Sequence, residues 1–121
     1  MVIFNIPKII HLTHKHEVPK YVLDAIRTLN PGYTIEFSLD RDCVQFLKKH
    51  YNDDVAKLFN MIFKGMHKAD LWRLCKLYIC GGIYMDVDLV PLVAFDAIFA
   101  RNKHKYSMYT CRDLSSQHIF Q

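Results

Sequence analysis

Residues 68–92 of the chain read KADLWRLCKLYICGGIYMDVDLVPL, and the rest of the sequence is organised around this stretch. Apolar residues recur in its first half with the period of an α-helix, which predicts a helix over 66–80. On that helix Leu71, Leu74 and Tyr78 fall on one stripe, which we expect to face the core.

Two consecutive glycines mark the end of this helix. Gly81 stands where a left-handed helix cap favours a residue without Cβ, and Gly82 allows the chain to reverse at once. The sequence over 83–88 then predicts a short buried strand, and Pro91 stops it from continuing. The stretch is therefore expected to be a helix, a sharp reversal and a strand.

Two spacings in this stretch place charged side chains together. Asp70 and Arg73 are three residues apart, so on a helix both point from the same face. Asp86 and Asp88 are two apart, so on a strand both leave one side while Val87 points into the core. Neighbouring carboxylates repel each other unless a cation intervenes, and Mg²⁺ and Mn²⁺ prefer such oxygen ligands. The pattern predicts a metal that carries a diphosphate, although either pair alone is more often a surface ion pair or part of a solvated turn.

The whole array resembles the DXD-motif sugar transferases of the GT-A fold. Their hallmark is an Ala-Asp-x-x-Arg helix followed by Gly-Gly-(Ile/Val)-Tyr-x-Asp-x-Asp. The matching positions here are Ala69, Asp70, Arg73, Gly81, Gly82, Ile83, Tyr84, Asp86 and Asp88. The family includes capsular and outer-chain mannosyl- or galactosyltransferases, and the glucosylating bacterial toxins are distant relatives. The resemblance implies an α/β fold, namely the Rossmann-like nucleotide-sugar-binding half of GT-A, with a small, mostly parallel sheet flanked by helices.

The resemblance also implies a function. It predicts a metal-dependent hexosyltransferase that moves a sugar from a UDP- or GDP-linked donor to a glycan, lipid or protein acceptor, with retention of configuration. By the family pattern Asp88 binds the metal, and Asp86 spans the metal and the hydroxyls of the sugar or ribose. Asp70 and Arg73 would hold the transferring sugar beside Tyr84. The expected catalytic residues are thus Asp70, Arg73, Asp86 and Asp88, the metal residues are Asp86 and Asp88, and the cofactor is Mn²⁺ or Mg²⁺.

An apolar run near the start of the chain predicts a central strand over 9–13. Its IPKIIH segment is similar to the opening strand of the family, whose carboxyl end receives the nucleotide base, as open α/β sheets do in general. The family usually has tryptophan where this chain has His14, and an imidazole offers a base less stacking area. The implied nucleotide-sugar-binding residues are His11, Leu12, Thr13, His14, Asp70, Arg73, Tyr84 and Asp86.

The same histidines allow two alternatives. His11, His14 and His16 could form a zinc site, but no fourth ligand is evident in the sequence. A loop of solvated histidines is the other alternative.

The remaining segments predict a strand–helix–strand succession, which implies a parallel, right-handed unit. We expect helices over 19–29, 42–50 and 52–63, strands over 33–39 and 105–111, and a single helical turn over 95–100. Asp40 is expected to be the N-cap of the second helix, or else an acidic residue near the nucleotide, and Gly65 to end the third helix. The inward residues are expected to be Tyr21, Val22, Ala25, Ile26 and Leu29 on the first helix and Val44, Phe46 and Leu47 on the second.

Length and composition indicate one globular domain over 1–121, incomplete relative to the family, because 121 residues with 51% hydrophobic content can build a core. No apolar run is long enough to span a membrane, and Pro7 and Lys8 interrupt any signal-peptide core. The cysteines show no CxxC or zinc spacing, so we expect reduced thiols and a cytoplasmic protein. Those in the motif helix are expected to be buried. The cysteines are Cys43, Cys75, Cys80 and Cys111.

Two other functions compete with catalysis. A chain that lacks part of the family's length could be a non-catalytic nucleotide-sugar-binding module that needs a partner chain, and exposed apolar surface would let it form a homo-oligomer. A net charge of +4 also suits a nucleic-acid-binding domain. We expect no nucleic-acid partner, however, because the basic clusters over 48–50 and 101–105 lack interleaved exposed aromatic residues.

Overall fold

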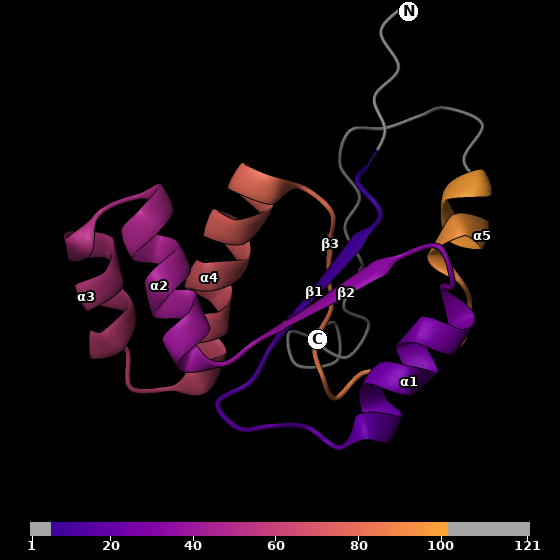
Figure 1. The fold of residues 1–121 in the computed structure, drawn as a ribbon, viewed down its shortest axis with the longest axis horizontal. Helices are drawn as coiled ribbons and strands as arrows, with labels where there is room; N and C mark the ends of the chain where they lie inside the picture. Colours follow the sequence, from indigo (N-terminus) through magenta and orange to yellow (C-terminus); the bar gives the residue numbers. More distant parts are fainter. Residues whose placement is uncertain (1–5, 102–121) are drawn as a thin grey trace, which may run out of the picture.

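A computed structural model of the chain describes residues 6–101, which form an α/β fold (Figure 1). The predicted strand over 105–111 lies outside the described residues. In chain order the elements are β1 (Ile9–Thr13), α1 (Lys20–Leu29), β2 (Thr34–Ser38), α2 (Asp40–His50), α3 (Asp53–Met61), α4 (Gly65–Cys80), β3 (Ile83–Tyr84) and α5 (Phe95–Ala100).

The sheet confirms the predicted central strand. Its order is β2-β1-β3, and both neighbours run parallel to β1. The register places His11 opposite Glu36 on one side and opposite Tyr84 on the other. Since side chains opposite one another in a parallel sheet share a face, these three residues point the same way.

One face of the sheet is covered by α1 and α5, which lie together in the view of Figure 1. Ile10 and Leu12 of β1 are fully buried there, against Ile26 of α1 and Met85 beyond β3. Phe95 of α5 packs against the same cluster. Ile10 and Leu12 are two residues apart on β1, so both side chains point to this face and form an apolar core there.

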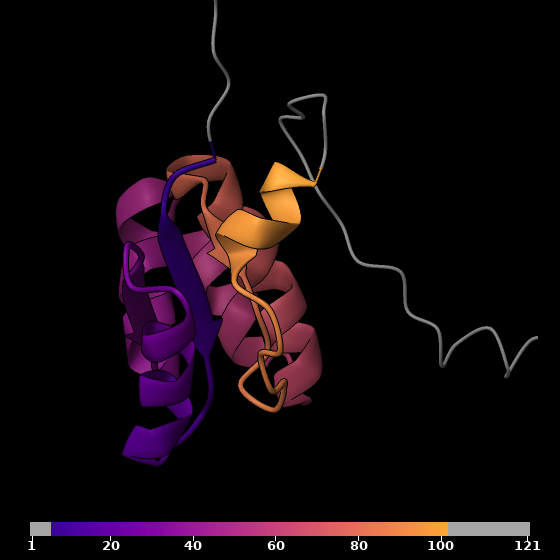
Figure 2. The same ribbon diagram turned by 90° about the vertical axis from the view of Figure 1, so that its right-hand side faces the viewer.

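The opposite face is covered by α2, α3 and α4, which lie on the other side of the strands in Figure 1 and behind them in Figure 2. A second cluster there contains Cys43, Leu47, Ala56, Phe59 and Trp72. It meets a polar strip of the sheet, because His11 and Glu36 point to this side and Lys76 of α4 lies 3.4 Å from the Glu36 carboxylate. The site described below lies at the end of this strip.

The orientation of α4 differs from the prediction. Trp72 is fully buried, whereas Leu74 is 67% and Tyr78 84% exposed. Residues two apart on a helix point about 200° apart, so burying the large indole turns Leu74 outward. Leu71 packs on the core as predicted, and Cys75 joins it there.

The end of the motif also differs. The strand predicted over 83–88 is only two residues long, because β3 ends at Tyr84 and the chain then turns, with the amide of Leu89 donating to the carbonyl of Asp86 at 3.2 Å. Val87 is partly buried against the α1 side of the sheet, as expected. Gly65 is the first residue of α4 and does not end α3, which stops at Met61.

The first two helices need smaller corrections. On α1, Tyr21 is 73% exposed and Ala25 is also exposed, while Leu23 packs on the core in their place. The helix α2 begins at Asp40, so Asp40 is not its N-cap. Leu39 holds the N-cap position, and its amide donates to the Asp42 carboxylate at 2.9 Å.

The cysteines in the described part of the chain are free. Cys43 is buried, whereas Cys75 and Cys80 are only half-buried, so the motif helix does not enclose them as fully as expected. No helix within residues 6–101 is both long and apolar enough to cross a bilayer.

Candidate active site

The double glycine fixes the reversal between α4 and β3. Gly81 has φ 65° and Gly82 has φ 96°, values that side-chain-bearing residues rarely adopt. A Cβ on Gly82 would lie 2.7 Å from the Ile9 carbonyl oxygen and 3.0 Å from Nε2 of His11. The reversal therefore packs directly on β1, and only glycine fits at its second position.

The side chain of His11 on β1 contacts this reversal. It is fully buried, and Nε2 lies 2.8 Å from the Gly81 carbonyl oxygen. A carbonyl oxygen only accepts, so Nε2 carries the proton. Burial lowers the pKa of His11 below its usual 6.5, which keeps the ring neutral. The other nitrogen, Nδ1, lies 3.4 Å from Oε2 of Glu36 without forming a hydrogen bond, because an unprotonated ring nitrogen and a carboxylate oxygen are both acceptors.

The two aspartates of the motif, Asp86 and Asp88, follow the end of β3, and both are exposed. The Tyr84 hydroxyl donates to Oδ1 of Asp86 at 2.9 Å. Burial and then the hydrogen bond to Asp86 raise the pKa of Tyr84, so its phenol stays protonated and remains a donor. Asp88 follows in the same turn. One carboxylate is thus oriented by a tyrosine, and the other is free to move in solvent.

Asp70 and Arg73 of α4 are connected to Asp86 through the same residue, Tyr84. Nη2 of Arg73 donates to Oδ1 of Asp70 at 2.9 Å, which confirms that both side chains share one face of α4. The Arg73 guanidinium lies 5.3 Å from the centroid of the Tyr84 ring. Asp70, Arg73, Tyr84 and Asp86 therefore form a continuous line of contacts across the glycine reversal.

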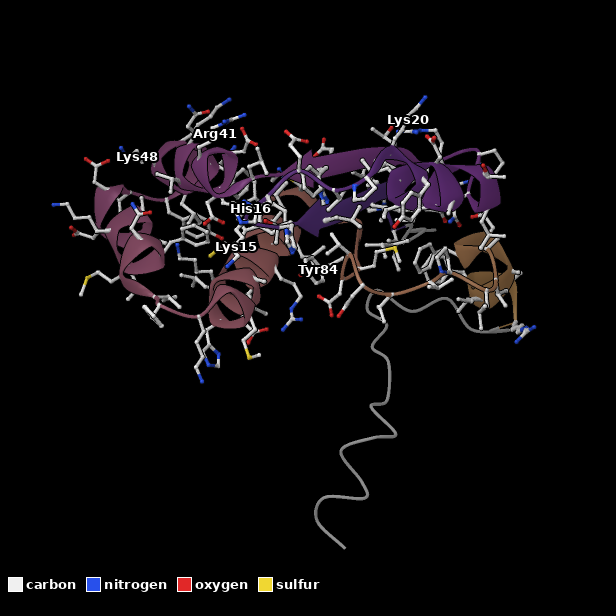
Figure 3. The ribbon with its side chains drawn as sticks, turned by 90° about the horizontal axis from the view of Figure 1, so that it is seen from below. Lys15, His16, Lys20, Arg41, Lys48 and Tyr84 are labelled. Carbon is white, nitrogen blue, oxygen red and sulfur yellow. The ribbon has the colours of Figure 1, made fainter. Side chains whose placement is uncertain are left out.

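A cleft of about 480 Å³ opens beside this line. It lies where β1 and β3 end, and Figure 3 shows Lys15, His16 and Tyr84 near one another in this region. The lining residues come from the loop after β1, the start of α2, the end of α3, the start of α4 and the motif turn. They are Thr13, His14, Lys15, Asp40, Phe59, Gly65, Met66, Lys68, Ala69, Tyr84, Asp86, Val87 and Asp88.

The cleft brings together most of the predicted site residues, but not all of them. Asp70 and Arg73 lie next to the cleft without lining it. His11 and Leu12 have fully buried side chains, so neither side chain can contact a ligand there. Alternation along β1 explains this, because each of these residues is enclosed by one of the two layers of helices.

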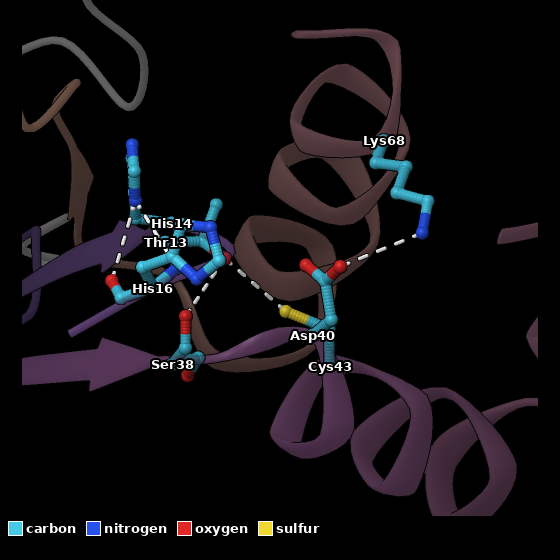
Figure 4. A network of polar contacts seen from close by, with 7 residues as sticks. All are labelled: Thr13, His14, His16, Ser38, Asp40, Cys43 and Lys68. Carbon is cyan, nitrogen blue, oxygen red and sulfur yellow. Dashed lines mark hydrogen bonds and ion pairs between the residues drawn. The ribbon is translucent and has the colours of Figure 1, made fainter. Parts of the chain in front are cut away.

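Two cations in the lining were not expected from the sequence. Lys15 follows His14 in the loop after β1, and Lys68 stands two residues before Asp70 on α4. Nζ of Lys68 lies 3.5 Å from Oδ2 of Asp40, as drawn in Figure 4. The spacing of Lys68 from Asp70 was visible in the sequence, but its partner is 28 residues away and could not be read from it.

The loop after β1 is shaped by local hydrogen bonds (Figure 4). The Thr13 hydroxyl donates to the carbonyl of Ser38 at 2.8 Å, which ties β1 to β2. The amide of His16 donates to Nδ1 of His14 at 3.2 Å. These contacts leave the His14 ring exposed at the mouth of the cleft.

Comparison with known proteins agrees with this geometry. Residues 15–105 match the family model described as the glycosyltransferase sugar-binding region containing the DXD motif. The chain belongs to this family. It is also 35% identical over 69 residues to the initiation-specific alpha-1,6-mannosyltransferase of Candida albicans. That match covers 55% of this chain and 18% of the relative. No solved structure matches the chain.

A divalent metal fits the donor set of the cleft. No group of three His, Cys, Asp or Glu side chains able to hold an ion occurs within residues 6–101, which gives no support to the alternative zinc site. Asp86 and Asp88 are nevertheless both exposed and both line the cleft. Mg²⁺ is commonly held by one or two carboxylates and completes its shell with water and substrate phosphate. These two aspartates are such a set, and their oxygens also suit Mn²⁺.

Proposed function

We propose that this chain binds a UDP- or GDP-linked hexose together with Mn²⁺ or Mg²⁺, and that the site serves transfer of the hexose to an acceptor. The observation that carries the proposal is the line from Asp70 through Arg73 and Tyr84 to Asp86 beside a cleft that Asp88 also lines. It supports the proposal because two carboxylates suited to a metal would then lie next to a carboxylate and a guanidinium suited to sugar hydroxyls.

The acidic corner would act on the leaving group. Asp86 and Asp88 would hold the metal, which when bound offsets the negative charge of the departing diphosphate. Tyr84 donates to one oxygen of Asp86 and so fixes the direction of its other oxygen. The hydroxyl keeps its proton at neutral pH because the pKa of Tyr84 is raised by burial and by that hydrogen bond. A fixed carboxylate lowers the cost of arranging the site around the ion.

Asp70 and Arg73 would bind the sugar. Their side chains are 56% and 38% exposed, so polar atoms remain available although the two residues pair with each other. A guanidinium donates and a carboxylate accepts, which suits the hydroxyls of a hexose. The exposed His14 ring, which also lines the cleft, would stack on the base. Retention of configuration belongs to this proposal through the family resemblance.

The test is the release of nucleoside diphosphate from UDP- and GDP-sugars with and without Mn²⁺. Mannose-carrying nucleotides come first, because the named relative is a mannosyltransferase. We expect Mn²⁺-dependent release from the wild type and a loss of about tenfold or more in Asp88→Asn, because metal-assisted charge stabilisation is worth several kcal/mol. Asp54→Asn, an exposed substitution of the same kind in the first turn of α3, is the matched control. Equal rates in the wild type and Asp88→Asn would remove the catalytic assignment.

A non-catalytic binding module is the second candidate, since within residues 6–101 no third His, Cys, Asp or Glu side chain joins Asp86 and Asp88. Calorimetry that shows donor and Mn²⁺ binding without release of diphosphate would support this candidate. The structure adds no support for nucleic-acid binding. Lys48 and Lys49 lie in the last turn of α2, where cations stabilise the end of a helix, so their presence is explained without a nucleic acid.

A further inference from the structure

Lys68 lines the cleft, but it has no part in the function proposed above. Its side chain is only 19% exposed, and its stem and ammonium lie over Phe59, with Nζ 5.1 Å from the ring centroid. Its ion pair with Asp40 is long, at 3.5 Å. A partly desolvated ammonium is stabilised by a close anionic partner. Asp40, at the edge of hydrogen-bonding distance, supplies that stabilisation incompletely.

The charges of the cleft indicate what a better partner would be. The charged lining side chains are Lys15 and Lys68 against Asp40, Asp86 and Asp88, so the lining carries one negative charge in excess if the histidine is neutral. A divalent ion held by Asp86 and Asp88 reverses this sign. The phosphate groups that follow such an ion into the cleft then need cations on the remaining walls, and Lys68 is the one that is already partly desolvated.

We infer that Lys68 binds the diphosphate of the donor, and that Asp40 is the counter-ion that holds the lysine when no donor is present. This inference rests on the proposed function. Asp40 is suited to an exchange of partners, because it is the first residue of α2. The positive end of the helix dipole stabilises its carboxylate after the lysine has left. Asp40 is also 42% exposed, so water can replace the lost contact.

A purely structural ion pair between α2 and α4 would leave a different signature. If Lys68 only joins the two helices, removing its charge should lower the stability of the fold and should lower the affinity for every ligand to a similar extent. If it binds diphosphate, its removal should have opposite effects on two ligands. Diphosphate binding should weaken, whereas binding of Mn²⁺ alone should not, because a like charge has left the cleft.

The experiment compares Lys68→Met, Asp40→Asn and the wild-type chain by calorimetry. Methionine keeps an apolar stem over Phe59 and removes only the charge. The titrants are Mn²⁺ alone, then GDP or UDP and the matching monophosphate in the presence of Mn²⁺. Lys57→Ala is the matched control, since Lys57 is an exposed lysine on α3 that does not line the cleft.

For Lys68→Met we expect diphosphate affinity to fall about tenfold or more, monophosphate affinity to fall less, and Mn²⁺ affinity to stay equal or rise. For Asp40→Asn we expect diphosphate to bind as tightly as in the wild type or tighter, and Lys57→Ala should match the wild type. Diphosphate binding by Lys68→Met at wild-type strength would overturn the inference and leave the proposed function standing, and so would an equal loss of Mn²⁺ and nucleotide. A wild-type chain that binds neither Mn²⁺ nor a nucleoside diphosphate would overturn both.

Discussion

The Tyr84 hydroxyl donates a hydrogen bond to the Asp86 carboxylate at 2.9 Å, while the Arg73 guanidinium lies over the ring of the same tyrosine. One side chain thereby connects the helical and the post-strand parts of the motif. Tyrosine is suited to this position because its apolar ring can pack on Trp72, 6.3 Å away, while its polar tip reaches the cleft.

Tyr84→Phe removes the hydroxyl and keeps the ring. We expect Mn²⁺ affinity to fall about three- to tenfold, because Asp86 loses the donor that orients it, with only a small change in stability. Calorimetry with Mn²⁺ measures the first effect and urea unfolding the second. Tyr51→Phe is the control, since it removes a hydroxyl that donates to the carbonyl of Cys75 far from the aspartates. Unchanged Mn²⁺ binding in Tyr84→Phe would show that the hydrogen bond does not matter for the ion.

Gly82→Ala and Gly65→Ala are expected to change stability in opposite directions. At Gly82 the added Cβ meets the Ile9 carbonyl at 2.7 Å and the φ of 96° is strained for alanine, so we expect a loss of about 2 kcal/mol or more. At Gly65 nothing lies within 4 Å and the residue begins a helix, so we expect a gain of about 0.5–1 kcal/mol. Chemical denaturation of both variants measures the difference. A Gly82→Ala protein as stable as the wild type would contradict the packing of the reversal on β1.

The buried His11 predicts that stability falls in mild acid. The folded chain holds its pKa below 6.5, whereas the unfolded chain titrates near 6.5. As the pH falls through 6.5 the unfolded state takes up a proton that the folded state refuses, so the free energy of unfolding decreases, by at most about 1.4 kcal/mol per pH unit for this group. Stability from this source is therefore present above pH 6.5 and lost below it.

Urea unfolding at pH 7.5, 6.5 and 5.5 tests the histidine. His11→Gln keeps a donor for the Gly81 carbonyl and removes the titrating group, so the slope between pH 6.5 and 5.5 should flatten whatever the absolute stability of the variant. Equal slopes in the wild type and His11→Gln would assign the pH dependence to other groups.

The orientation of α4 predicts a contrast between two leucines. Leu47→Ala creates a cavity in the cluster around Trp72 and should cost about 2–5 kcal/mol. Leu74→Ala changes a side chain that is 67% exposed and should cost less than about 0.5 kcal/mol. Thermal or urea unfolding of the two variants measures both losses of stability. A Leu74→Ala cost that approached that of Leu47→Ala would favour the inward stripe expected from the sequence.

The local parts of the site were predictable because their spacing is short. A separation of three on a helix brought Asp70 and Arg73 together, and the two glycines predicted a reversal that the observed φ angles confirm. The central position of β1 followed from the nearly continuous apolar run that contains it.

The rest depended on packing across the chain. The helix α4 carries apolar residues nearly all round, so periodicity could not show that Trp72 would face the core instead of Leu74. The alternation after Tyr84 indicated a longer strand, but only Ile83 and Tyr84 find partners on β1. The pairing of Lys68 with Asp40 joins two helices and leaves no pattern in the sequence.

The shortness of β3 has a further consequence. Two paired residues and the bond from the Met85 amide to the His11 carbonyl hold the segment that carries both aspartates. The side chains of Ile83, Met85 and Val87, packed on the core beside Ile10 and Leu12, anchor the same segment. Among the described residues, the turn that carries Asp86 and Asp88 has only one backbone hydrogen bond, from the Leu89 amide to the Asp86 carbonyl. This turn can therefore open while both helical layers stay folded, and the Leu89 amide should exchange with deuterium far sooner than the Met85 amide.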